Sequence, residues 1–583
     1  MRGVRAASVF LFLLWNAART MPLCAQEILS NLNTSWTQVL PGSVICEPVS
    51  TSYGFCLATD ARNIMGFSSN GKLLWEKNIG RSRNINLTVL PGDFILFHDS
   101  DSNNLRLFNP SGSEVWQKQL DFTPLSKAFA GRDGRFFLHG ENKIICLGIN
   151  GNVRWQLETS PQKNLPLQEL SDGSIIIFLC DEEGKTKGLR ISPFGEELEN
   201  ITFSGSVKNC CTCSEGILLV FTDGSAGLFS VKNGLSVNRW VTSVKAGNLI
   251  FLVSPDKSDF RLLSLSSSEI KIYKIDLETG YELASWKLSG INGDALLLSV
   301  YSDSGIFLCD SNSGILFDED FHELWTGRLP SEVKTKSINQ LFYLQQDYLV
   351  FCNKNWSMNA YHTCQTTSKS SSQNKNKNLY YSDFISVDLN DFNFYIQDSF
   401  FDALKNPERV QKIKEGNFGT SEAEWLSQTL SIARLVEINS TSQTFGTHRE
   451  ASVFETDSKG LESILTQLTL LCTNQTQNAA AAIISKSNNK SVCRMLMVNL
   501  TGYDPDGKLL QAIEKNALQA GNRDTHYLTT ICDTVYSICY FMGRPAYNKQ
   551  GKDILKNFLG PAYNSDVRLY ARDTLKKIIA LEL

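Results

Sequence analysis

Apolar and polar residues alternate in short runs between about residues 36 and 364, which is the pattern of half-buried β-strands. One unit has apolar runs at 94–97 and 105–108, then a turn at Gly112 and a further run that carries Trp116. Ser-Gly and Asn-Gly turns between such runs favour hairpins, because glycine adopts the positive φ that these turns require. The pattern predicts four short antiparallel strands in each unit.

These units repeat along the chain, and each repeat is marked by a turn glycine and a tryptophan. The clearest copies are Gly71 with Trp75, Gly112 with Trp116, and Gly151 with Trp155. Weaker copies occur at Gly195, at Gly234 with Trp240, at Gly280 with Trp286, and at Trp325, where Phe321 replaces the glycine. Successive turn positions are 41, 39, 44, 39, 46 and 41 residues apart.

Four short antiparallel strands in about forty residues are typical of one β-propeller blade. Seven copies carry the turn, and an eighth copy at 338–362 lacks its fourth strand. An extra strand with Trp36 is expected upstream, at 35–40. The sequence therefore predicts an all-β propeller of eight blades at 36–364, closed by this N-terminal strand, with seven blades as the alternative. We expect each tryptophan to fill the space between neighbouring blades.

The residues from Asp276 to Trp286 resemble the repeat of PQQ-like (quinoprotein-type) propellers, whose blades end in a similar D-x-x-T-G…W pattern. The shorter form at 70–75, N-G-K-L-L-W, is similar to the degenerate repeat of non-enzymatic members, including propeller lipoproteins of bacterial outer-membrane assembly. The resemblance covers about residues 36–364. It implies the propeller architecture and leaves the function open.

The last third of the chain changes to helical spacing. A polar segment at 366–378 lies within an expected linker at 365–397, and an all-α domain is expected at 398–583. Helices are predicted at 421–437, 461–472, 479–485, 492–500, 509–520, 527–541, 552–559 and 566–581. The run 566–571 (D-V-R-L-Y-A) resembles the start of the second helix of HEAT-type repeats. We therefore expect a HEAT-like helical repeat that folds as a unit of its own, with a plain helical bundle as the alternative.

The N-terminus has the order of features found in export signals. Arg2 and Arg5 precede an apolar run at 6–18, and Ala25 offers a cleavage point, so residues 1–25 are interpreted as a signal peptide. An uncleaved anchor, or a tether through a lipidated Cys24, are the alternatives. The mature chain is then expected to be periplasmic, envelope-associated or secreted, with no transmembrane segment.

Charge limits the classes of partner. The chain has a net charge of −4, and removal of three arginines with the signal peptide makes it more acidic, so no overall attraction to nucleic acid or anionic lipid is expected. Other envelope proteins are the expected partners. The oligomeric state is left open.

Cysteines offer the strongest candidate chemistry. Residues 210–213 read Cys-Cys-Thr-Cys and are placed on the first strand of a blade, near the central channel. A soft-metal site needs a fourth ligand, usually from a second Cys-x-x-Cys or a paired histidine, and no histidine lies within fifty residues, so structural cysteines are the preferred interpretation. The resemblance supplies an alternative, since adjacent cysteines form a vicinal disulfide over the cofactor in some quinoprotein alcohol dehydrogenases. Cys46 and Cys56 are a candidate disulfide.

Other candidate sites are weaker. His98 and His139 are interpreted as turn or rim residues, and 99–103 as a polar hairpin loop rather than a calcium loop. No catalytic, cofactor-binding or metal-ligating residue is assigned, and no cofactor is expected. The sequence favours an exported, non-catalytic scaffold for protein–protein interaction. A PQQ-type dehydrogenase and a propeller that binds a small ligand or glycan are the alternatives.

Overall fold

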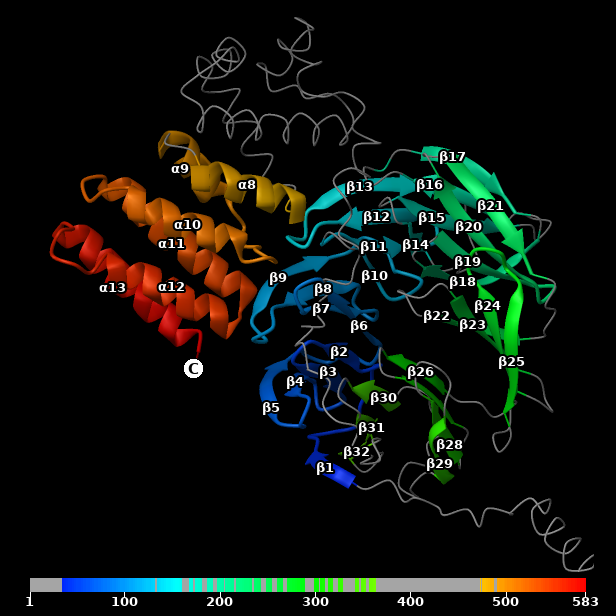
Figure 1. Cartoon of the computed structure of the whole chain (residues 1–583). Helices are drawn as coiled ribbons and strands as arrows, with labels where there is room; N and C mark the ends of the chain where they lie inside the picture. Colours follow the sequence, from blue (N-terminus) through cyan, green and yellow to red (C-terminus); the bar gives the residue numbers. More distant parts are fainter. Residues whose placement is uncertain are drawn as a thin grey trace, which may run out of the picture.

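The computed structural model describes residues 34–362 and 472–582, apart from short stretches inside each range. Four-stranded antiparallel sheets, the blades of a propeller, are followed by six helices (Figure 1). The predicted signal peptide, the linker and the helices expected at 421–437 and 461–472 lie outside the described residues, except for Cys472.

Eight four-stranded sheets are present in the described part of the chain, numbered here in chain order. Sheets 1 to 4 contain β2 (Val49–Thr51), β3 (Gly54–Thr59), β4 (Asn63–Ser68), β5 (Leu73–Asn78); β6 (Ile85–Leu90), β7 (Phe94–Asp99), β8 (Asn104–Phe108), β9 (Glu114–Gln119); β10 (Phe129–Ala130), β11 (Phe136–His139), β12 (Lys143–Leu147), β13 (Val153–Glu158); β14 (Gln168–Glu169), β15 (Ile175–Cys180), β16 (Thr186–Ile191), β17 (Glu197–Thr202). Sheets 5 to 8 contain β18 (Val207–Cys213), β19 (Gly216–Phe221), β20 (Ala226–Lys232), β21 (Leu235–Val241); β22 (Asn248–Val253), β23 (Asp259–Leu265), β24 (Ile270–Asp276), β25 (Glu282–Leu288); β26 (Leu298–Ser302), β27 (Gly305–Cys309), β28 (Ser313–Phe317), β29 (Glu323–Arg328); β30 (Leu341–Leu344), β31 (Tyr348–Cys352), β32 (Ser357–His362), β1 (Thr34–Val39).

The N-terminal strand completes the last sheet, as predicted. β1 pairs antiparallel with β32, with Thr37 opposite Asn359. Sheet 8 therefore has the order β1-β32-β31-β30 and joins the two ends of the strand region (Figure 1). A buried hydrophobic cluster, which includes Phe55 from sheet 1 and Val350 from sheet 8, packs the closing sheet against the first one. The eight sheets agree with a count of eight rather than seven.

The turn glycine and the tryptophan of the repeat meet between neighbouring sheets. A Cβ added at Gly112 would lie 2.3 Å from a ring carbon of Trp75, the tryptophan of the preceding sheet. The same contact recurs between Gly71 and Trp36, Gly151 and Trp116, Gly195 and Trp155, and Gly280 and Trp240. The glycine therefore serves two purposes, because its φ is positive and because only a hydrogen leaves room for the indole. This confirms the predicted role for these tryptophans, while the side chains of Trp286 and Trp325 lie outside the described residues.

Gly112→Ala is expected to destabilise the fold more than Gly80→Ala, which is its matched control. Both glycines have a φ near +78°, but nothing lies within 4 Å of a Cβ at Gly80. Each alanine meets the strain of a left-handed backbone, about 1–2 kcal/mol. Only Gly112→Ala must also displace Trp75, which adds a further ~1–3 kcal/mol for overpacking. Urea unfolding of both variants tests this, and equal losses would contradict the contact.

The six helices overlap their predicted positions, and each begins between one and seven residues before its predicted start. They are α8 (Asn474–Lys486), α9 (Lys490–Asn499), α10 (Lys508–Gln519), α11 (Thr525–Met542), α12 (Pro545–Asn557) and α13 (Ser565–Ala580). Only α12 differs substantially, because it begins at Pro545 rather than at Lys552. None of these described helices is both long and apolar enough to cross a membrane.

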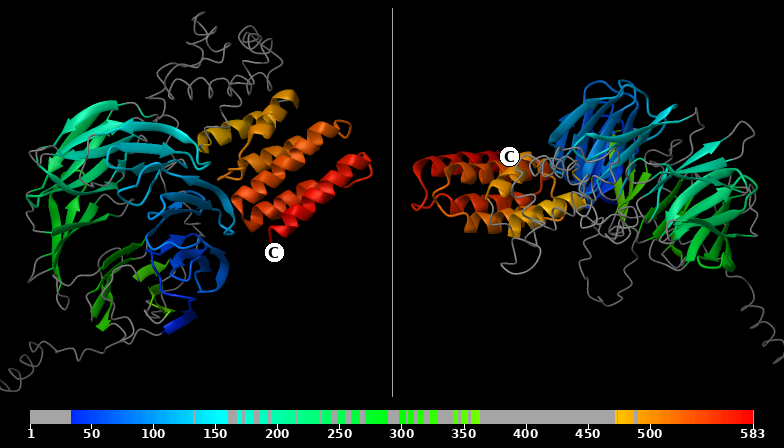
Figure 2. Two further views of the ribbon diagram at one scale, coloured as in Figure 1. Left: turned by 180° about the vertical axis from the view of Figure 1, so that it is seen from behind. Right: turned by 90° about the horizontal axis from the view of Figure 1, so that it is seen from above.

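The helices are arranged in two layers (Figures 1 and 2). α8, α10 and α12 follow one another in one layer, and α9, α11 and α13 in the other. Each helix thus packs on the helix two positions along the chain as well as on its sequence neighbour. This arrangement buries one face of α13, and no other helix of the described part of the chain packs on its opposite face.

Candidate functional site

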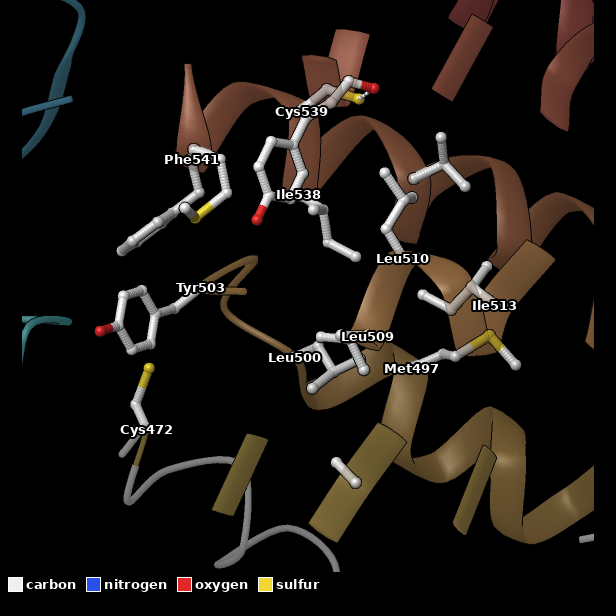
Figure 3. Packing of buried hydrophobic residues seen from close by; sticks show 14 of the residues in the cluster. Cys472, Met497, Leu500, Tyr503, Leu509, Leu510, Ile513, Ile538, Cys539 and Phe541 are labelled. Carbon is white, nitrogen blue, oxygen red and sulfur yellow. Dashed lines mark hydrogen bonds between the residues drawn. The ribbon is translucent and has the colours of Figure 1, made fainter. Parts of the chain in front are cut away.

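The helical part, which was expected to form a folding unit of its own, packs directly on the propeller. One hydrophobic cluster contains buried residues of sheets 2 and 3 together with residues from all six helices. Phe94 of β7 lies at its centre, with its ring centroid 5.3 Å from that of Phe541 and 6.2 Å from that of Tyr503. Figure 3 shows Tyr503 and Phe541 close together beside the other buried helical residues. Propeller and helices therefore share a core.

Asp93 is the polar centre of the same junction. It lies in the turn between β6 and β7 with a φ of 64°, and it is 3% exposed. Its carboxylate accepts hydrogen bonds from the backbone N–H of Ser52 at 2.8 Å and from the Ser52 hydroxyl. The guanidinium of Arg544, in the turn between α11 and α12, donates to Asp93 at 3.0 Å and to the carbonyl of Gly92 at 2.7 Å. Asp93 thus connects sheet 1, sheet 2 and the helical region.

A second contact joins the same helical turn to the hairpin between β8 and β9. The side-chain N–H of Asn109 donates to the carbonyl of Tyr540 at 2.7 Å, while the Tyr540 hydroxyl donates to the carbonyl of Glu114 at 3.1 Å. A Cβ at Gly543 would lie 2.6 Å from the Asn109 side chain. Gly543 also has the positive φ of a helix C-cap, so it both ends α11 and permits the close approach. The interface is therefore specific in shape as well as apolar.

The cysteine run at 210–213 lies on β18, the first strand of its sheet, as predicted. The Cys210 side chain is buried between sheets 4 and 5. Burial raises the pKa of its thiol to about 12, and a hydrogen bond with Gln168 opposes this shift only partly. The thiolate, which is the nucleophilic form, is therefore disfavoured at neutral pH. The side chains of the other two cysteines of the run lie outside the described residues.

The candidate disulfide between Cys46 and Cys56 is wrong, since both thiols are free and buried. The Cys46 sulfur instead accepts a hydrogen bond from the backbone N–H of Ala58 at 3.1 Å. Burial raises the pKa of Cys46 to about 12 and that of Cys56 well above its usual value. These cysteines therefore pack as small hydrophobic residues. Among the described residues, no three histidine, cysteine or acidic side chains are grouped so that they could hold a metal ion.

The interpretation of His98 and His139 as rim residues is also wrong. Both side chains are buried within second strands, His98 on β7 and His139 on β11. Neither ring nitrogen of His98 has a hydrogen-bond partner. Burial lowers the pKa of both histidines, although the Asp99 carboxylate opposes the shift at His98. The hairpin loop at 99–103 is as expected, and within it Asp99 accepts hydrogen bonds from the backbone N–H of Asp101 at 3.0 Å and from the Ser102 hydroxyl at 2.5 Å.

These two histidines predict a loss of stability in acid. An unfolded histidine takes up a proton near pH 6.5, whereas the buried ones do so only at lower pH, so the unfolded state binds more protons below pH 6.5. The free energy of unfolding is expected to fall as the pH decreases through this range. Urea titrations across it should give a shallower decrease for the double variant His98→Gln/His139→Gln. An unchanged pH dependence would contradict this assignment.

Comparisons with known proteins show a distant likeness in fold. No protein-family model matches the chain, and no curated protein sequence matches it. The crystal structure of BamB from Moraxella catarrhalis is similar at 13% identity with a TM-score of 0.42, covering 57% of this chain and 99% of that one. A catalytically inactive virginiamycin B lyase from Staphylococcus aureus, with quinupristin, has 12% identity and a TM-score of 0.34, covering 47% and 93%. BBS1N in complex with ARL6DN has 12% identity and a TM-score of 0.33, covering 48% and 92%. At these values the likeness gives no information about ligand or activity.

The functional residues that sequence reasoning missed are those of the junction. In the sequence, Asp93 and Asn109 have no feature that distinguishes them from other turn residues. Arg544 simply follows Gly543, a glycine that ends a helix. One signal was available, because Gly543-Arg544-Pro545 combines a helix stop with a proline suited to the first turn of the next helix. That signal predicts a tight turn between α11 and α12. It does not predict what the turn contacts.

Proposed function

We propose that this chain is an exported, non-catalytic scaffold for protein–protein interaction in the cell envelope, and that envelope or outer-membrane assembly is its setting. One observation carries the proposal: the strands and the helices share a buried core and the Asp93–Arg544 ion pair. Two regions that each offer an extended surface are thereby held in a fixed mutual orientation. A fixed pair of surfaces suits a protein that arranges partners relative to one another.

Each region is assigned to a repeat type within this proposal. The strand region is an eight-bladed PQQ-like propeller closed by β1, supported by the recurring glycine–tryptophan contact. The helical region is a HEAT-like repeat, supported by its two-layer stacking. The 566–571 run fits this assignment, because Val567 and Ala571 face inward on α13 while Arg568 faces solvent. Repeat arrays of this kind present long surfaces to partners.

An exposed apolar patch on the propeller is a candidate contact area. Val39 is 73% exposed and Trp356 is 54% exposed. They lie on adjacent segments at one end of sheet 8, because the backbone N–H of Leu40, the residue after Val39, donates to the carbonyl of Trp356 at 2.7 Å. Exposed tryptophan beside aliphatic residues is typical of the centre of protein interfaces.

Affinity capture from the native envelope, followed by mass spectrometry, tests the scaffold function. Wild type should capture a defined set of proteins, and the double variant Val39→Ser/Trp356→Ser should lose members of that set. Tyr281→Ser is the control, because Tyr281 is as exposed as Val39 but lies in the turn before β25 of sheet 6, and it should retain them. Identical sets for all three proteins would contradict a role for this patch.

Enzymatic activity is the outcome that would overturn the proposal. Purified protein reconstituted with calcium and PQQ should give no dye-linked alcohol oxidation. Reproducible oxidation that is abolished by Cys210→Ser would instead favour the dehydrogenase, and saturable binding of a glycan without captured proteins would favour a ligand-binding propeller.

A further inference from the structure

The last helix, α13, is buried on one side only. It packs on α11 and α12 through a single stripe of buried residues, at positions 567, 571, 574 and 578. In Figure 1 it lies at the lower left edge of the helical region, on the side opposite α8 and α9. In this two-layer arrangement, each preceding helix of its layer is covered on that side by the next one. The exposed side of α13 is thus the position that a further helix would occupy.

The outer face of α13, as the term is used here, consists of Arg568, Leu569, Arg572, Lys576 and Ile579. All five side chains are exposed, and Leu569 and Ile579 are 51% and 44% accessible to solvent. The solvent-facing side of an amphipathic helix is normally polar. The two exposed aliphatic side chains on this face therefore offer apolar contact area to a partner.

The same face carries a row of positive charges. Arg568, Arg572 and Lys576 are spaced i, i+4 and i+8, so they are neighbours on the helix, and like charges at this spacing disfavour the helix slightly. Of these three cations, only Lys576 has an acidic partner among the described residues. That partner is Asp573 at 3.1 Å, and such an exposed pair is weak. The helical region as a whole is basic, since residues 474–582 contain 14 Lys and Arg against 9 Asp and Glu. An acidic surface of a partner could therefore form ion pairs with Arg568 and Arg572.

We propose that the outer face of α13 docks an acidic amphipathic helix of a partner protein, an inference that rests on the scaffold function proposed above. A helix laid along α13 would place its aliphatic residues against Leu569 and Ile579, in the ridges-into-grooves manner of the array itself. Acidic residues at i, i+4 and i+8 of that helix would then face Arg568, Arg572 and Lys576. The ion pairs would set the orientation of the partner helix, and the contacts of its aliphatic residues would bury the apolar surface of Leu569 and Ile579.

Two other occupants fit this face less well. A second copy that used the same face would bring its own cation row against this one, and like charges across an interface oppose association. A membrane surface requires a broad apolar face that enters the headgroup region. Here two aliphatic residues are separated by cations along a narrow stripe, which matches the width of one helix.

The probe is a synthetic amphipathic helical peptide with glutamates at i, i+4 and i+8 beside a stripe of leucines. Its binding to the full mature chain is measured by fluorescence anisotropy. The triple variant Arg568→Glu/Arg572→Glu/Lys576→Glu should weaken binding by on the order of tenfold or more, because three exposed pairs become repulsive. A second peptide with lysines in place of the glutamates should bind this variant better than it binds wild type. That reciprocal exchange is a result that a merely unfolded variant cannot give.

A matched control makes the same change in charge on the other layer. Lys515→Glu/Lys549→Glu/Lys556→Glu reverses three exposed lysines of α10 and α12 and should leave binding of the acidic peptide nearly unchanged. Equal weakening by both triple variants would overturn the proposal. So would equal affinity of wild type for the two peptides, or wild type binding to phosphatidylglycerol vesicles through these residues but not to the acidic peptide.

Failure here is distinguishable from failure of the scaffold function. If wild type captures partners from the native envelope but the outer face of α13 does not select the acidic peptide, the scaffold stands and only this docking surface is wrong. If no partner is captured and dye-linked oxidation is found, the scaffold function itself fails, whatever the peptide does.

Discussion

Arg544→Ala is expected to lower the free energy of unfolding by about 3 kcal/mol, the lower end of the range for removing one partner of a buried ion pair. Asp93 is nearly inaccessible to solvent and would keep only its hydrogen bonds from Ser52. The carbonyl of Gly92 would also lose its donor. Urea unfolding followed by circular dichroism measures the loss, and both strand and helix signals should shift together.

Arg572→Ala is the matched control for this experiment, because it removes an arginine whose side chain lies in solvent. Exposed substitutions away from special features change stability by roughly 0.5 kcal/mol or less. If Arg544→Ala behaves like this control, the pair with Asp93 contributes nothing, and the polar part of the junction is not a stabilising contact.

Phe94→Ala is expected to cost about 3–5 kcal/mol, as is usual when a fully buried phenylalanine is truncated. Phe94 belongs to β7, yet its ring packs on Tyr503 and Phe541 of the helical region. The cavity would therefore open between strands and helices. Amide hydrogen exchange should accelerate in α11 as well as in β7, although α11 itself is unchanged in sequence.

Phe178→Ala is the control, because it removes an equally buried phenylalanine that lies away from the junction with the helices. Phe178 is equally buried, but it packs on Phe203 in the cluster between sheets 4 and 5. It should destabilise the strands around it without a specific increase of exchange in α11. The same exchange pattern for both variants would mean that the helices respond to any loss in the strands rather than to a shared core.

Much of the strand architecture was predictable from local pattern. Gly112 and Trp116 mark a turn and a strand because the backbone conformation and the size of the indole are local properties. Counting strands also predicted that the strand at Trp36 closes the propeller. The last copy lacks one strand and the N-terminus has a spare one, so together they complete one sheet. These features repeat, so each copy supported the others.

Helix boundaries were less certain where the apolar pattern is weak. The first turns of α12 carry few apolar residues, so the pattern placed its start at Lys552, whereas Pro545 in the first turn marks the actual start. Gly551 inside this helix has a packing reason, because a Cβ there would lie 2.5 Å from the Cys539 sulfur of α11. Close approach of two helices, rather than propensity, explains that glycine.

The junction could not be predicted because its partners are far apart in the chain. Arg544 and Asp93 are separated by 451 residues, and neither belongs to a motif with known chemistry. Burial of His98 was missed for a related reason. Its position near the end of a strand gave no sign of the neighbouring side chains that cover it.

The most direct test of the shared core is to cut the chain between strands and helices. A specific protease site is introduced into the 366–378 segment, the mature protein is cleaved, and the products are examined by size-exclusion chromatography without denaturant. If strands and helices share a core, the two pieces should elute together as one particle, and Phe94→Ala should make them separate. Two pieces that separate from cleaved wild type, each still folded by circular dichroism, would contradict the account.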